Sequence, residues 1–117
     1  FEKQNAAALS FGQQKLVELA QVLILRPSII LLDEPASGIN PTLIEKLANV
    51  IRRLNEAGTT VLIVEHNIPL VLSLCSKVHV LAAGQVLTSG TPEEIRNDPL
   101  VIEAYLGPDH LLEAPSV

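Results

Sequence analysis

The stretch ILLDEPASGIN, residues 30–40, begins as an apolar run and ends in two acids, a proline and a glycine turn. Residues 29–32 are all aliphatic, and Asp33 and Glu34 follow them directly. A short aliphatic run bounded by turn residues is typical of a strand that is buried in a parallel sheet. We therefore predict a strand over residues 29–33 that ends in two neighbouring carboxylates.

Helix and strand signals alternate on both sides of this run. Ser10 and Gln13 form an S-x-x-Q capping box, which predicts the start of a helix that Pro27 ends. Asn40 and Pro41 are suited to the N-cap and first turn of the next helix. Periodicity predicts further strands at residues 60–65, 78–81 and 85–88, and helices at 41–57, 68–74, 92–96 and 99–106.

This order predicts an α/β fold, with a mainly parallel sheet flanked by helices and a short C-terminal antiparallel hairpin followed by helices. Residues 29–33, 41–57 and 60–65 would form one βαβ unit, whose two strands end at the same edge of the sheet. Ligands of open α/β sheets bind at that edge. The pairs Asp33–Glu34 and Glu65–His66 should therefore lie close together.

These strand-end residues suit the hydrolysis of a nucleotide phosphoanhydride. Asp33 could hold Mg²⁺, which prefers oxygen ligands and often shares them with phosphate. Glu34 could orient or deprotonate an attacking water, and His66 could hydrogen-bond a terminal phosphate. Spacing alone leaves open the alternative that these are solvated polar residues at the ends of strands.

The segment LSFGQQK, residues 9–15, adds a candidate anion site at the start of the first helix. Ser10 and Gln13 cap that start, where free backbone N–H groups and the helix dipole favour negative charge. Gly12 would let a phosphate approach the backbone closely. The same residues also make an ordinary helix start, which is the alternative.

Composition limits the classes of protein that fit this chain. Its 117 residues are 48% hydrophobic but only 3% aromatic, which suits an aliphatic sheet covered by helices. The net charge is -5 and no basic stripe is present, so we expect no nucleic-acid partner. The single cysteine, Cys75, excludes an internal disulfide.

Four segments in order resemble the motifs of the nucleotide-binding domain of ATP-binding cassette (ABC) transporters. LSFGQQ resembles the LSGGQ signature, and IILLDEP resembles Walker B with its following glutamate. SGIN resembles the D-loop, and VLIVEHN resembles the strand with the switch histidine. The resemblance covers residues 9–106 and implies part of a P-loop NTPase core that uses ATP and Mg²⁺ to power transport across a membrane.

The resemblance also implies roles for individual residues. Asp33 would serve Mg²⁺, Glu34 would polarise the attacking water, and His66 would sense the γ-phosphate. Ser10, Gly12 and Gln13 would contact the γ-phosphate of ATP held by an opposing subunit. The D-loop residues that would communicate across this dimer are Ser37, Gly38 and Asn40.

Two residues depart from the motifs. Phe11 replaces the first glycine of LSGGQ, which requires a backbone with negative φ at that position and narrows the approach to phosphate. Asn40 replaces the usual D-loop aspartate, so it keeps the N-cap role but lacks the charge. The roles of both segments are therefore expectations that depend on local geometry.

LSFGQQK together with the segment GTPEEIRNDPLVIEAYLG resembles the ATPases of branched-chain amino acid importers and their urea or amide relatives. The ATPase of lipopolysaccharide export has a similar tail and is the alternative. Either implies a second nucleotide-binding subunit, as a homo- or heterodimer, and transmembrane permease subunits. It also implies a peripheral location at the cytoplasmic face of the cell membrane.

The sequence contains no G-x-x-x-x-G-K-[ST] P-loop. We therefore expect it to correspond to the C-terminal part of one such domain, and to be inactive alone. A non-catalytic interaction module that reuses this half-fold is the competing class. The expected parts are a signature helix at 10–26, a core at 28–67, a hairpin with helices at 77–106 and a loose tail at 107–117.

Overall fold

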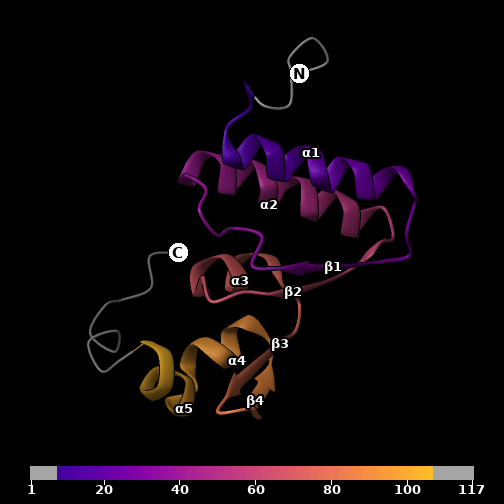
Figure 1. Ribbon diagram of the computed structural model, residues 1–117. Helices are drawn as coiled ribbons and strands as arrows, with labels where there is room; N and C mark the ends of the chain where they lie inside the picture. The colour runs from indigo at the N-terminus through magenta and orange to yellow at the C-terminus, as the bar shows by residue number, and fades with distance from the viewer. Residues whose placement is uncertain (1–7, 107–117) are drawn as a thin grey trace. The chain divides into compact units, whose positions relative to one another are not determined.

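The computed structural model describes residues 8–106, so the predicted loose tail lies outside the described residues. The chain forms two compact units, Phe1–Asn67 and Ile68–Val117. The first contains α1 (Phe11–Ile24), β1 (Ile29–Asp33), α2 (Pro41–Glu56) and β2 (Thr60–Val64). The second contains α3 (Ile68–Leu74), β3 (Val78–Ala82), β4 (Gln85–Gly90), α4 (Pro92–Asn97), α5 (Pro99–Val101) and η2 (Ile102–Leu106) (Figure 1).

Both helices of the first unit begin where the capping residues predict. The Ser10 hydroxyl accepts a hydrogen bond from the Gln13 backbone N–H at 3.2 Å, and the Gln13 side chain accepts one from the Ser10 N–H at 3.0 Å. Asn40 Oδ1 accepts from the Leu43 N–H at 2.9 Å. Helix α1 ends at Ile24, earlier than the predicted residue 26. Its chain turns out of the helix because a residue before proline disfavours the α conformation, and Arg26 has φ 49°.

The βαβ unit has the predicted parallel pairing. Strands β1 and β2 run in parallel register from Ile29 opposite Thr60 to Asp33 opposite Val64. Helices α1 and α2 lie side by side on one side of the two strands (Figure 1). Side chains of a strand alternate between its faces, and Ile30, at 4% exposed, belongs to the covered face. Because the strands are parallel and α2 connects them, both strands end at one edge of the sheet.

The side chains on the opposite face of this sheet are largely exposed. Its side chains are aliphatic yet half or more exposed: Ile29 at 53%, Leu31 at 69%, Leu62 at 52% and Val64 at 58%. Soluble monomers rarely expose contiguous apolar patches beyond a few hundred Å². We call these four residues the open sheet face.

The second unit contains the predicted hairpin. Strands β3 and β4 are antiparallel and joined by Ala83 and Gly84, whose φ values of 51° and 76° match a tight two-residue turn. Within residues 8–106, β3 pairs with β4 and not with the parallel sheet, so the strands form two small sheets and not one. Closing a two-residue loop costs little entropy, which favours this local pairing. The buried residues Val78, Ile95 and Val101 form the core.

The last predicted helix, over residues 99–106, is less regular than expected. It contains α5 over Pro99–Val101 and then the wider π-helical turn η2 over Ile102–Leu106. The Tyr105 hydroxyl donates a hydrogen bond to the Leu81 carbonyl, which ties this turn to β3. Over residues 8–106, no helix combines the length and apolar character needed to cross a membrane.

We expect the 117-residue chain to associate with itself through the open sheet face. Replacing Leu31 and Leu62 by serine should reduce this association, because both side chains are exposed on that face. Sedimentation velocity over a range of concentrations measures the effect. Leu100→Ser, which changes an exposed leucine in the second unit, is the matched control. A monomer at every concentration in the unsubstituted chain would contradict the expectation.

Candidate functional site

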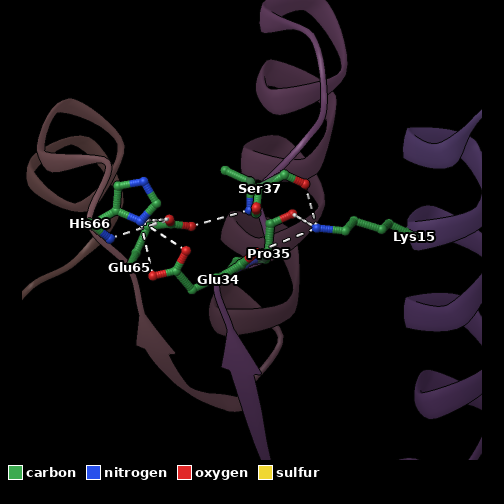
Figure 2. A network of polar contacts seen from close by, with 7 residues as sticks. Lys15, Glu34, Pro35, Ser37, Glu65 and His66 are labelled. Carbon is green, nitrogen blue, oxygen red and sulfur yellow. Dashed lines mark hydrogen bonds and ion pairs between the residues drawn. The ribbon is translucent and has the colours of Figure 1, made fainter.

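Glu34 and His66 meet at the edge where the two parallel strands end. The Glu34 N–H donates to the Val64 carbonyl at 2.7 Å, which extends the strand pairing by one residue. His66 Nδ1 lies 2.8 Å from Glu34 Oε2 and 2.9 Å from Oε1 (Figure 2). The predicted proximity of the two strand-end pairs is therefore confirmed.

The backbone of Glu34 has an uncommon conformation. Its φ is 50°, in the left-handed region, which costs a residue with a side chain roughly 1–2 kcal/mol. Such a conformation persists where surrounding contacts determine it. The Glu34 carbonyl accepts from the Ser37 N–H at 3.1 Å, so the chain turns sharply just after the strand.

Glu65, the neighbour of His66, has a buried carboxylate. The sequence motifs indicate no role for it. Its side chain is only 1% exposed. Glu65 Oε2 accepts from the Ala36 N–H at 3.2 Å, and Oε1 accepts from the His66 N–H at 3.3 Å. A buried carboxylate needs such donors. Glu65 therefore links the end of β2 to the turn that follows β1.

The acidic neighbours change the titration of His66. Its pKa is raised from 6.5, first by the hydrogen bond to Glu34, then by the charge of Glu34 and, more weakly, by that of Glu65. Partial desolvation opposes this increase. Because 73% of the His66 side chain is exposed, the imidazole can also reach a ligand from solvent.

Asp33, the predicted Mg²⁺ ligand, is not part of this cluster. Its residue is exposed at the end of β1. Across residues 8–106, one group of three side chains could hold a metal ion, with ligand atoms within 4.8 Å of one another. Its members are Glu34, Glu65 and His66. An exposed carboxylate oxygen still fits a hard cation that keeps most of its water and shares phosphate ligands. The assignment of Asp33 to Mg²⁺ stays a prediction.

The predicted anion site lies at the first turn of α1. Ser10 is exposed, and its hydroxyl accepts from Gln13 while retaining its own hydrogen for donation. Gly12 is buried, and a Cβ added there would lie 2.5 Å from Leu43 Cδ1. Glycine at this position therefore allows α1 to approach α2 closely. Phosphate contacts by Ser10, Gly12 and Gln13 stay predictions.

The remaining predicted residues are Phe11 at the start of α1 and three residues of the segment between β1 and α2. Phe11 has a helical backbone with negative φ, as its departure from the signature motif requires. Gly38 has φ 75°, and a Cβ added there would lie 2.9 Å from the Phe11 ring. Glycine is thus required for both conformation and space. The roles of Ser37, Gly38 and Asn40 across a dimer stay predictions.

We expect His66 to titrate above 6.5 in the folded chain. Its ion pair with Glu34 exists while the imidazole is protonated, so it is complete below that pH and is lost as the pH rises through the increased pKa. Glu34→Gln should move the midpoint down toward 6.5, while Glu45→Gln on the exposed surface of α2 should not. NMR titration of the imidazole measures both. An unsubstituted midpoint at or below 6.5 would contradict the geometry.

Two family models match the chain. One, described as "Branched-chain amino acid ATP-binding cassette transporter", matches residues 85–110. The other, described as "AAA domain, putative AbiEii toxin, Type IV TA system", matches residues 2–73. The first match lies within the second unit, and the second match covers nearly all of the first unit.

Individual relatives are ATP-binding proteins of transport systems. The branched-chain amino acid transport ATP-binding protein LivG of Salmonella typhimurium is 43% identical over 105 residues, 89% of this chain and 41% of LivG. The lipopolysaccharide export ATP-binding protein LptB of Acidithiobacillus ferridurans is 43% identical over 100 residues, 86% of this chain and 42% of LptB. The chain therefore spans about two-fifths of the length of these relatives.

A solved structure agrees with the sequence comparisons. MJ1267, an ATP-binding cassette of an ABC transporter, matches with a TM-score of 0.79 at 35% identity. The match covers 89% of this chain and 43% of MJ1267. The chain thus belongs to the family of ABC transporter ATP-binding domains, and it corresponds to the C-terminal region of such a domain.

Proposed function

We propose that this chain is part of an ATP-hydrolysing subunit that powers transport across a membrane. The contact between His66 Nδ1 and Glu34 Oε2, at 2.8 Å, supports this function most directly, because it lies just beyond the ends of two adjacent parallel strands. This edge is where open α/β sheets bind ligands. A carboxylate and an imidazole in contact there supply a base and a hydrogen-bond donor to one reacting centre.

In this proposal Glu34 is the general base and His66 binds the terminal phosphate. When His66 donates to a phosphate oxygen, the Glu34 carboxylate is released from the imidazole and can accept a proton from water. Asp33 would hold Mg²⁺, which when bound neutralises charge on phosphate oxygens. The exposure of His66 supports this exchange of partners, because the ring can turn toward solvent.

A second copy of the same region would complete the site. Ser10, Gly12 and Gln13 would contact the γ-phosphate of ATP held by the opposing subunit. The exposed Ser10 hydroxyl and the start of α1 support this role, since both favour an anion. Ser37, Gly38 and Asn40 would communicate between the two sites from the turn before α2.

The solute is proposed to be a branched-chain amino acid or a related amide. The match of residues 85–110 to the branched-chain amino acid transporter model supports this choice. Lipopolysaccharide export is the alternative, because LptB is as similar in sequence over its matched length as LivG. The subunit would lie at the cytoplasmic face of the membrane, bound to transmembrane permease subunits. Uptake of labelled leucine in cells with and without the complete protein distinguishes the two.

In the complete protein, Glu34→Gln should leave ATP binding nearly unchanged and slow hydrolysis by about 100-fold or more, because an amide keeps the shape but cannot accept the proton. ATP-dependent dimers should then accumulate. Steady-state hydrolysis and nucleotide titration measure the two effects. Glu45→Gln makes the same change on the exposed surface of α2 and should be neutral. Normal turnover in Glu34→Gln would remove Glu34 from the catalytic role.

The 117-residue chain alone should bind Mg-ATP no tighter than roughly millimolar, about -4 kcal/mol, and should not hydrolyse it. Most of the affinity of P-loop proteins comes from the loop amides and lysine, and this chain has no P-loop motif. Asp33 and Glu34 would repel a triphosphate, by about 1 kcal/mol for a solvated pair of charges. Isothermal calorimetry measures the binding. Micromolar affinity would contradict the expectation by revealing another phosphate site.

A further inference from the structure

The turn after β1 holds a residue other than glycine, Glu34, in the left-handed conformation. Residues 34–38 include two positive φ values, 50° at Glu34 and 75° at Gly38. Within this turn, Ser37 donates to the Glu34 carbonyl at 3.1 Å. The conformation of Glu34 must therefore depend largely on contacts from outside the turn.

Lys15 of α1 provides such contacts. Its Nζ donates to the Ser37 carbonyl at 2.7 Å and lies 3.4 Å from the carbonyls of Glu34 and Pro35. Figure 2 shows the three carbonyls converging on this one ammonium group. Hydrogen bonds from a charged donor are stronger than neutral ones. Lys15 therefore binds the turn to the helix.

Phe11, one helical turn before Lys15, restrains this contact from the same side. Its ring centroid lies 5.0 Å from Lys15 Nζ, a cation–π distance. The ring also packs against Gly38, where an added Cβ would meet it at 2.9 Å. The Lys15 ammonium is thus held between an aromatic ring and the carbonyls of the turn.

Glu65, directly after β2, contacts the turn from the other side. Its buried carboxylate accepts the Ala36 N–H at 3.2 Å, while Lys15 takes the carbonyls on either side of Ala36. The turn is therefore fastened by an anion through an N–H group and by a cation through C=O groups. The turn is contacted both by α1 and by the residue that follows β2.

We propose that Lys15 is a positioning residue, which holds residues 34–38 so that the Glu34 carboxylate stays at His66. The catalytic consequence rests on the proposed function, whereas the structural consequence does not. Without the ammonium, three carbonyls turn to water and Glu34 is free to leave its left-handed conformation. The Glu34 carboxylate then moves away from the imidazole.

The titration of His66 separates this role from a plain charge effect. Lys15→Met removes a positive charge, which by itself raises the pKa of a nearby imidazole. If Lys15 positions Glu34, however, the loss of the Glu34 contact lowers the pKa of His66 toward 6.5. The sign of the change therefore identifies the mechanism.

NMR on the 117-residue chain tests the structural consequence. In Lys15→Met, the His66 midpoint should fall, and the Ser37 amide should exchange about tenfold faster or more as the turn loosens. Lys15→Arg, which keeps a charged donor, should retain most of both properties. Lys46→Met, on the exposed surface of α2, should change neither. An unchanged or raised His66 midpoint in a folded Lys15→Met chain would overturn the proposal.

Hydrolysis by the complete protein tests the catalytic consequence. Lys15→Met should lower kcat by about tenfold or more with little change in KM, because a small displacement of a base is costly. Lys15→Arg should restore most of kcat. A change in KM without a fall in kcat, or an unchanged kcat, would overturn the catalytic role. If the unsubstituted protein shows no hydrolysis, the proposed function fails, while the NMR result still decides the positioning role.

Discussion

The parallel pairing of β1 with β2 is the constraint on which the candidate site depends. The register that sets Asp33 opposite Val64 brings both strands to one edge, and the hydrogen bond from Glu34 to Val64 continues it by one residue. A shift of one residue would exchange the faces of every side chain in the strand. The contact between Glu34 and His66 therefore follows from the register, and α2 makes the parallel pairing possible because it is the crossover between the two strands.

Around this edge, the carboxylates of Glu34 and Glu65 each accept hydrogen bonds from neighbouring polar groups. Glu65 is buried and uses its two oxygens for backbone N–H groups of Ala36 and His66, while Glu34 takes the exposed imidazole. Both oxygens of the buried acid are thus used by backbone donors, whereas the more exposed acid is open to solvent. Two carboxylates close in space have different environments, which is how neighbouring acids come to serve different roles.

Local signals in the sequence were sufficient for the helix starts, the strands and the hairpin. Capping residues, prolines and aliphatic runs act over a few residues, so they predict the starts of α1 and α2. The meeting of Glu34 with His66 follows from the rule that the two strands of a βαβ unit end at one edge of the sheet. The contacts of Lys15 with the turn join residues 19 to 22 positions apart, and no periodicity encodes them. The left-handed conformation of Glu34 and the burial of the Glu65 side chain likewise depend on contacts between segments that are distant in the sequence.

A double-mutant cycle on ATP hydrolysis by the complete protein measures whether Glu34 and His66 act as one catalytic pair. Residues that act as one unit are strongly non-additive, because the first substitution already removes their joint effect. If Glu34 and His66 form one catalytic pair, the double variant Glu34→Gln with His66→Ala should be about as slow as the slower single variant. Rate losses that multiply would show that the two residues act independently, and would contradict the account of a shared site at this edge.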